Sequence, residues 1–184
     1  MPAFFTLVLV VLGVTTAVMG KLGQPGGPLK LPRENIDIFK VIQSYPSAVA
    51  IADTVNDSMQ QCLSARRTSI DQEALTATYV WTLQKTDSLP KQEITFNVRP
   101  GKEPGTLDMT VGDDPTPKET IVYYADDDCI VMDVEDANHH CLLWIRPELK
   151  DSVPQVCTDY FADACGISAP EHSRDLCNDD EADV

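Results

Sequence analysis

The sequence has only three histidines and contains none of the short motifs that mark common catalytic centres. No H-E-x-x-H, G-x-S-x-G or phosphate-loop pattern occurs in it. Its six cysteines include no C-x-x-C pair, which disfavours a metal or redox centre. We therefore predict that the protein is not an enzyme and that it uses no cofactor and no metal.

Positive charge is also scarce, because 14 lysines and arginines face 29 acidic residues and leave a net charge of -15. A chain of this charge repels nucleic acid and anionic membranes, so neither is an expected partner. Most of the carboxylates are expected to form a solvated surface that keeps the protein in solution.

Long apolar runs are limited to one, from Phe4 to Val18, with the small residue Gly20 shortly after it. The run is shorter than the roughly 20 residues of a membrane span, so we predict a signal peptide over residues 1–20 and a secreted, extracellular protein. Secretion makes disulfide bonds the expected state of the cysteines, although their number alone permits many pairings. The sequon at Asn56 predicts a glycoprotein.

The rest of the chain reads as one domain between two tails. Residues 21–34 are rich in glycine and proline and predict an extended leader, residues 35–178 form the domain, and residues 179–184 form an acidic tail. The domain starts with apolar residues at helical spacing over residues 35–44. Eight strand-like segments at hairpin spacing follow: 48–54, 61–68, 75–83, 93–99, 106–111, 119–124, 129–134 and 141–145.

A second helix is predicted after the strands, beginning at Pro154 and ending at Gly166. The order helix, eight strands, helix predicts an all-β protein with an eight-stranded antiparallel up-and-down barrel. The interior of such a barrel is just wide enough for one small ligand. An immunoglobulin-like sandwich is the alternative, and the cysteine spacing and the final helix disfavour it.

The stretch from Tyr123 to Cys165 resembles the tick salivary lipocalins of the histamine-binding type. In that family a strand ending D-D-x-C-D-x precedes a strand with E-L-W, and V/I-P-x-x-C opens the final helix. Cys129, Leu143-Trp144, Val153-Pro154 and Cys157 match that pattern, whereas Ile130 and Leu142 stand where it has acidic residues. The resemblance implies a lipocalin barrel with the final helix packed outside it and held by disulfides. The implied pairs are Cys62–Cys177, Cys129–Cys157 and Cys141–Cys165.

The same register suggests which side chains face the interior. With Cys129 and Cys141 facing outward, their neighbours face inward, because side chains alternate along a strand. The predicted cavity residues are Tyr79, Trp81, Phe96, Thr120, Val122, Tyr124, Ile130, Met132, Leu142 and Trp144. The alternative is that these side chains simply fill a packed interior.

The resemblance implies a protein that sequesters a small host inflammatory mediator and thereby suppresses host defence. Histamine or another biogenic amine is the ligand class that it implies. The amine-binding members place carboxylates at positions matching Thr120, Ile130 and Leu142, and this chain has none there. Its predicted apolar pocket favours an eicosanoid lipid such as a leukotriene.

Each ligand class would need its own polar contacts. For an amine the candidate acids are Asp57, Glu93 and Glu119, and for a lipid carboxylate the candidate cations at the rim are Arg66, Arg67, Lys91, Arg99 and Lys118. The alternative function is a scaffold whose outer loops bind a host protein such as a complement component. The acidic loops at Asp113-Asp114 and Asp126 to Asp128 are its first candidates. In either case a monomer is expected.

Overall fold

The computed structural model describes residues 36–54, 63–83, 90–134 and 140–166. The predicted signal peptide, leader and acidic tail lie outside these residues. So do the sequon at Asn56, the candidate contact Asp57 and the predicted pair Cys62–Cys177.

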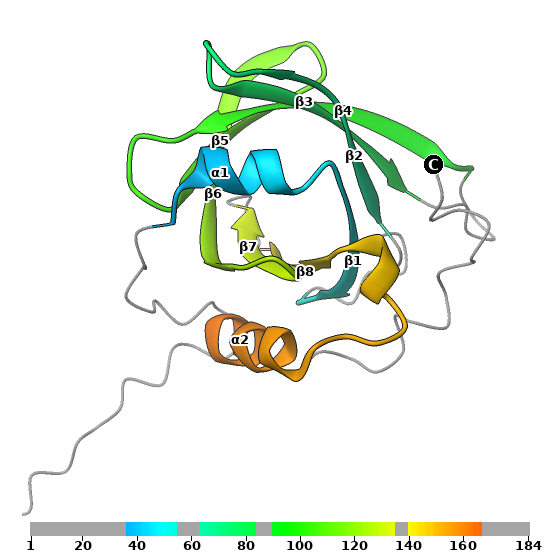
Figure 1. Cartoon of the computed structure of the whole chain (residues 1–184). Helices are drawn as coiled ribbons and strands as arrows, with labels where there is room; N and C mark the ends of the chain where they lie inside the picture. Colours follow the sequence, from blue (N-terminus) through cyan, green and yellow to red (C-terminus); the bar gives the residue numbers. More distant parts are fainter. Residues whose placement is uncertain (1–35, 55–62, 84–89, 135–139, 167–184) are drawn as a thin grey trace, which may run out of the picture.

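The strands form a closed antiparallel barrel in the order β1 to β8, and β1 pairs with both β2 and β8 (Figure 1). This confirms the predicted lipocalin-like barrel. Its strands are β1 (Ser47–Asp53), β2 (Ser64–Asp71), β3 (Thr76–Leu83), β4 (Gln92–Pro100), β5 (Thr106–Val111), β6 (Asp114–Ala125), β7 (Cys129–Val134) and β8 (His140–Ile145).

Alternation of side chains divides each strand between an apolar interior and an outer face. In β4, for example, Phe96 and Val98 are buried while Thr95 and Asn97 between and beside them are exposed. The strand β6 begins five residues earlier than predicted, because a tight turn joins it to β5. Gly112 in that turn has a φ of 54°, a conformation that glycine adopts without the clash a side chain would cause.

The first helix, α1 (Ile38–Ser44), lies across one end of the barrel (Figure 1). The carboxylate of Asp37 caps it by accepting a hydrogen bond from the backbone N–H of Lys40 at 3.1 Å. Ile38 and Ile42, one turn apart, are both buried against the barrel interior. The helix therefore closes that end with its apolar face.

The second helix, α2 (Gln155–Cys165), packs outside the barrel against β7 and β8. It follows a short 3-10 helix, η1 (Pro147–Leu149), which the sequence pattern did not predict. Pro154 precedes α2, and Gly166 ends it with a φ of 75°. Both of these boundaries agree with the prediction.

Two disulfides join α2 to neighbouring strands. Cys129 of β7 is bonded to Cys157, and Cys141 of β8 is bonded to Cys165. These are two of the three pairs that the family resemblance implied. Their sulfurs lie in a second apolar core between α2 and the barrel wall, where Phe161 is fully buried. Each bridge is expected to stabilise the fold by about 2–4 kcal/mol.

Candidate functional site

An apolar cavity of about 90 Å³ lies inside the barrel beneath α1. We call it the interior cavity. Side chains of α1 form one wall of it, and side chains from most of the strands form the rest. It is lined by Ile38, Val41, Ile42, Tyr45, Ala48, Ala65, Tyr79, Trp81, Val98, Leu107, Met109, Val122, Ile130, Met132 and Trp144.

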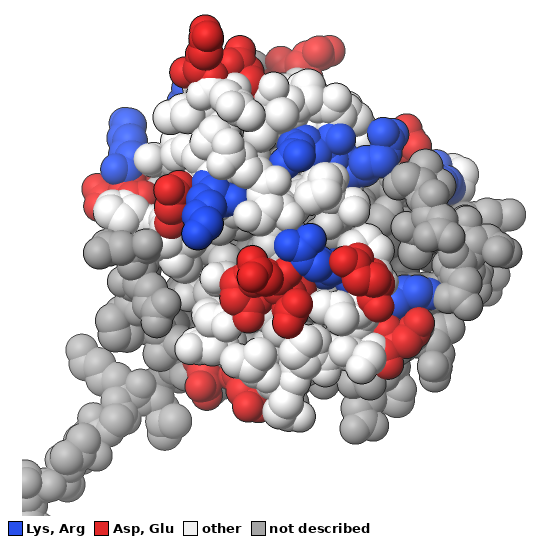
Figure 2. Space-filling view, in the orientation of Figure 1, with Lys and Arg blue, Asp and Glu red and all other residues white. Residues whose placement is uncertain are grey.

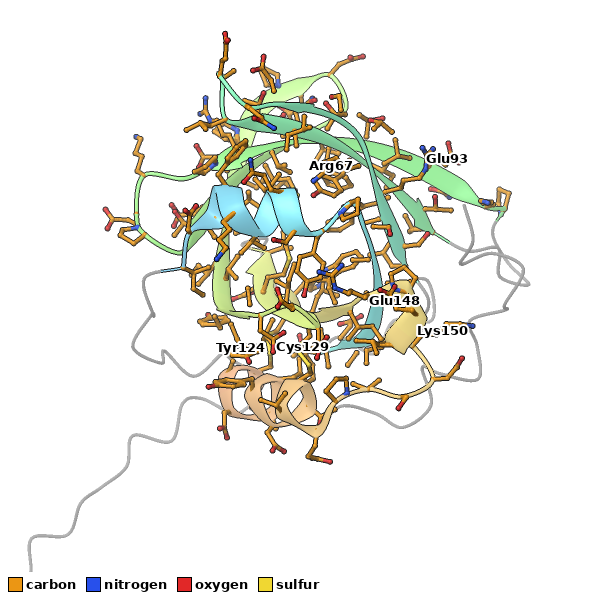
Figure 3. The ribbon with its side chains drawn as sticks, viewed as in Figure 1. Arg67, Glu93, Tyr124, Cys129, Glu148 and Lys150 are labelled. Atoms are coloured by element: carbon orange, nitrogen blue, oxygen red, sulfur yellow. A yellow bond between two sulfur atoms is a disulfide. The ribbon has the colours of Figure 1, made fainter. Side chains whose placement is uncertain are left out.

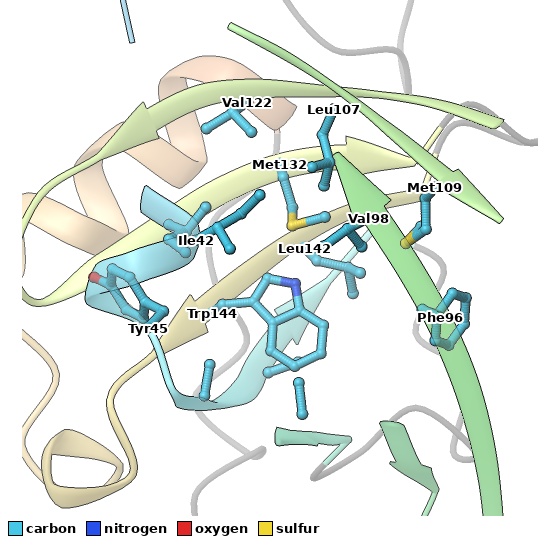
Figure 4. Close-up of a cluster of buried hydrophobic side chains, with 14 of the residues drawn as sticks. Ile42, Tyr45, Phe96, Val98, Leu107, Met109, Val122, Met132, Leu142 and Trp144 are labelled. Atoms are coloured by element: carbon cyan, nitrogen blue, oxygen red, sulfur yellow. The ribbon is translucent and has the colours of Figure 1, made fainter. Parts of the chain in front are cut away.

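Most of the predicted cavity residues face this interior. Those that line the interior cavity are Tyr79, Trp81, Val122, Ile130, Met132 and Trp144. Phe96 and Leu142 belong to the same interior cluster without lining the cavity itself (Figure 4). Thr120 is fully buried and pairs across the sheet with Leu107 and Val134 of that cluster, so its side chain also faces inward.

Tyr124 was predicted to face the cavity, and the structure corrects this. The pairing of β6 with β7 shifts between Val122 and Tyr124, so the strict alternation that the prediction assumed breaks there. The ring of Tyr124 lies between the barrel and α2 and stacks on Tyr160, with the ring centroids 3.7 Å apart (Figure 3). Its hydroxyl donates to the carboxylate of Asp126 at 2.8 Å.

The candidate acids that the structure describes do not reach the interior. Glu93 is exposed and lies beside Ile94, whose side chain packs on the interior cluster, so alternation turns Glu93 outward (Figure 3). Glu119 pairs with Asp108 on the outer face of the β5–β6 hairpin. The prediction of Glu93 as an inward polar contact was therefore wrong.

Three aromatic rings pack together inside the barrel. Trp81 lies with its ring centroid 4.2 Å from that of Phe96 and 4.9 Å from that of Trp144. Within the described part of the chain, two buried polar atoms that face this interior make no hydrogen bond. They are the indole nitrogen Nε1 of Trp144 and the hydroxyl oxygen Oγ1 of Thr120.

Hydrogen bonds to α1 carbonyls hold the helix over the interior cavity. The hydroxyl of Tyr79 donates to the carbonyl oxygens of Ile42 and Tyr45, at 3.1 and 2.7 Å. The guanidinium of Arg67 donates to the carbonyl oxygens of Ile42 and Gln43. We call these contacts the α1 clamp. Burial raises the pKa of Tyr79, and the charge of Arg67 partly opposes that rise.

Tyr45, which follows α1, is held at the same end of the barrel. Its hydroxyl donates to the backbone carbonyl of Asp126 at 2.9 Å, and the guanidinium of Arg146 lies 5.0 Å from its ring centroid. Burial raises the pKa of Tyr45, and the negative charge of Asp126 raises it further. The Asp126 carboxylate itself accepts from the backbone N–H groups of Asp128 and Cys129, both at 2.8 Å.

Comparison with known families identifies the chain. The family model described as tick histamine binding protein matches residues 37–176. The chain belongs to this family. The match covers the whole described barrel and both described disulfides.

Among solved structures, the tick histamine-binding family member described here is similar to japanin from Rhipicephalus appendiculatus, which was solved bound to cholesterol. The two share 15% sequence identity with a TM-score of 0.53, over 65% of this chain and 87% of japanin. That likeness supports the fold. The comparison with curated proteins found no match. No helix in the described ranges is long and apolar enough to cross a membrane.

Three interior positions bear on whether the barrel could hold a charged amine. Thr120, Ile130 and Leu142, which the sequence resemblance aligns with carboxylate positions, are all buried and all face inward. An acid at any of them would therefore point into the barrel. In this tick histamine-binding family member all three side chains are uncharged.

The candidate cations at the rim separate into two kinds. Arg67 belongs to the α1 clamp, and Arg99 forms an ion pair with Asp108 at 3.1 Å on the outer face. The remaining candidates, Arg66, Lys91 and Lys118, are exposed. None of these five cations lines the interior cavity.

Sequence reasoning missed the contribution of α1 to the cavity wall. Ile38, Val41, Ile42 and Tyr45 all line it. The spacing of the isoleucines signalled an amphipathic helix, but it carried no information about which surface would receive the apolar face. Val98, Leu107 and Met109 were also missed, although the alternation in β4 and β5 would have identified them.

Proposed function

We propose that the protein is a secreted salivary lipocalin that sequesters a small host inflammatory mediator inside its barrel and so suppresses host defence. It would act by stoichiometric binding without turnover. The observation that carries this proposal is an apolar cavity lined by the barrel strands and α1, and it is supported by the uncharged, buried side chains of Thr120, Ile130 and Leu142, which the sequence resemblance aligns with carboxylate positions.

The chemistry of the lining favours a lipid over an amine. A buried ammonium is costly unless a carboxylate pairs with it. Glu93 and Glu119 face outward, and within the described part of the chain no carboxylate lines the interior cavity. Contact with aromatic faces compensates only part of that cost. We therefore place an eicosanoid such as a leukotriene ahead of histamine or serotonin, and cholesterol in japanin is a precedent for an apolar ligand in this fold.

The interior cavity is too small to hold a lipid without a change in the structure. At about 90 Å³ it is far smaller than the roughly 300–1,000 Å³ of pockets that hold drug-sized ligands. A lipid would therefore have to displace side chains or α1. Met109 and Met132 are unbranched and adapt readily to a new shape, and α1 is held by the α1 clamp and by its apolar face rather than by a covalent bond between described residues. Binding should thus be coupled to an opening of the barrel.

Calorimetric titration of the disulfide-bonded protein with a leukotriene and, in parallel, with histamine tests the proposal. Tight one-to-one leukotriene binding without histamine heat is the expected result. The variant Ala65→Leu, which adds bulk inside the interior cavity, should weaken that binding. Thr95→Leu, an exposed change on β4, is the matched control and should not. Tight histamine binding would contradict the lipid assignment.

A second candidate function is supported by how little space the barrel encloses. A filled barrel suits a scaffold whose outer loops bind a host protein such as a complement component. Figure 2 shows acidic side chains in several separate groups on one face of the molecule. Of the predicted acidic loops, Asp126 is used in turn hydrogen bonds, whereas Asp113 and Asp127 are exposed.

The second candidate has its own test. Surface plasmon resonance with purified complement components should show binding that weakens in an Asp113→Asn, Asp127→Asn double variant. This outcome, combined with no heat from either small ligand, would replace the first proposal with the second.

A further inference from the structure

The indole of Trp144 presents an unused hydrogen-bond donor to the barrel interior. The residue is 3% exposed, lines the interior cavity, and its Nε1–H has no hydrogen-bond partner within the described residues. Leaving a buried donor unsatisfied costs roughly 1–3 kcal/mol, and the great majority of buried polar groups avoid that cost. Such an exception in the wall of a cavity indicates a group that is satisfied when the cavity is filled.

The neighbours of Trp144 cannot satisfy it. Figure 4 shows its nitrogen on the side of the ring that faces the interior cluster, with Met132 and Leu142 close by. These side chains are apolar, and the ring of Trp81 packs on the indole with a 4.9 Å centroid separation. A water molecule needs two to four polar partners, which an apolar lining does not provide.

We propose that Trp144 Nε1 is the polar anchor of the ligand site and donates a hydrogen bond to a neutral oxygen, a carbonyl or hydroxyl, on an otherwise apolar ligand. This assignment rests on the proposed function and specifies its ligand chemistry. An indole N–H only donates, and an ammonium also only donates, so the anchor cannot hydrogen-bond the ammonium group of an amine. A carboxylate at this point would lack a cation among the described residues, because no lysine or arginine of the described ranges lines the interior cavity.

A second unpaired group extends the same pattern. The hydroxyl of Thr120 is fully buried, faces inward from β6, and lies two residues before the cavity residue Val122. Its strand partner Leu107 also lines the interior cavity. This hydroxyl, which can donate or accept, is a second unpaired polar group on the inward face of β6. The interior therefore suits an apolar molecule with isolated oxygen atoms.

The test uses two small probes of similar shape, cyclohexanone and methylenecyclohexane, which differ in the oxygen acceptor. Binding is followed through the indole N–H signals in nitrogen-15 NMR spectra, since the chain has only two tryptophans. We expect the ketone to shift the Trp144 signal and to bind about two- to tenfold more tightly than the hydrocarbon, the range of one neutral hydrogen bond.

Trp144→Phe keeps an aromatic ring and removes the donor, so it should abolish the preference for the ketone. Trp81→Phe is the matched variant, in which both affinities fall together and the preference stays. An unchanged preference in Trp144→Phe, or no shift of the Trp144 signal, overturns the assignment. Calorimetry with a leukotriene distinguishes failure of the anchor from failure of the proposed function. If wild type and Trp144→Phe bind the leukotriene with equal affinity, the proposed function stands without this anchor. If the wild type does not bind it, the proposed function is refuted.

Discussion

Removing the hydroxyl of Tyr79 should loosen α1 while leaving the barrel intact. Tyr79→Phe keeps the ring that lines the interior cavity and deletes the group that donates to the carbonyl oxygens of Ile42 and Tyr45. The carbonyl of Ile42 still accepts from Arg67, whereas the carbonyl of Tyr45 loses this donor. The substitution thus isolates one part of the α1 clamp.

The expected loss follows from these contacts. One net hydrogen bond contributes about 0.5–1.5 kcal/mol, and a carbonyl left buried without a donor costs up to about 3 kcal/mol more. Tyr79 is only partly buried and the carbonyl of Ile42 keeps Arg67 as a donor, so the lower end of the range applies. We expect the free energy of unfolding to fall by about 1–2 kcal/mol. For a chain of this size each kcal/mol lowers the melting temperature by about 2–4 °C.

Denaturant unfolding gives the global loss, and amide hydrogen exchange gives its location. Exchange in α1 should accelerate about 5- to 30-fold, which is the population change that 1–2 kcal/mol produces. Amides of β7 and β8 should exchange at the wild-type rate unless global unfolding dominates. Tyr160→Phe is the control, because it removes a hydroxyl outside the barrel and keeps the stacked ring. It should change the free energy of unfolding by less than about 0.5 kcal/mol.

The reasoning fails if Tyr79→Phe unfolds like the wild type and α1 exchanges at an unchanged rate. The helix would then be held by its apolar face alone. An equal loss in both tyrosine variants would also refute it, since the effect would not depend on the α1 clamp.

Three further predictions concern charge, cross-links and packing. The pKa values of Tyr45 and Tyr79 are raised above 10 in the folded state. Their contribution to stability is therefore present below about pH 10 and is lost as the pH rises through their folded-state pKa values. A titration that follows phenolate absorbance should show two tyrosines that ionise only above the usual pH. Replacing Cys141 and Cys165 by alanine opens a bridge of sequence separation 24 and should lower the free energy of unfolding by about 3.5 kcal/mol in denaturant titration. Phe161→Ala should cost about 3–5 kcal/mol in the same assay, because that ring of α2 is fully buried against the barrel wall.

The sequence predicted the barrel well because alternation is a local property of each strand. Trp81 was placed inside from period two, Met132 and Trp144 from period two with Cys129 and Cys141 turned outward, and all three line the interior cavity. The same rule failed at Tyr124, because a shift in strand pairing depends on the partner strand and leaves no mark in the local pattern. Glu93 was misplaced although the alternation of β4 itself turns it outward.

The position of α1 depends on packing between distant parts of the chain. Ile38 and Ile42 indicate an apolar face, but a helix with such a face can pack on any apolar surface of the molecule. Its place over the barrel end is fixed by contacts to β2 and β3 through Arg67 and Tyr79. The sequence does not reveal that these two side chains hold α1, because arginine and tyrosine are also common in strands that make no such contact.

Every described strand has two hydrogen-bonded neighbours, since β1 pairs with β8 and closes the sheet on itself. Open sheets end in a row of unpaired backbone groups, which can recruit another chain and start aggregation. A protein that neutralises its target one for one must be delivered at a concentration comparable to that of the target. Closure of the barrel removes the edge-to-edge route to aggregation. The protein could therefore be secreted at the high concentration that the proposed function would demand.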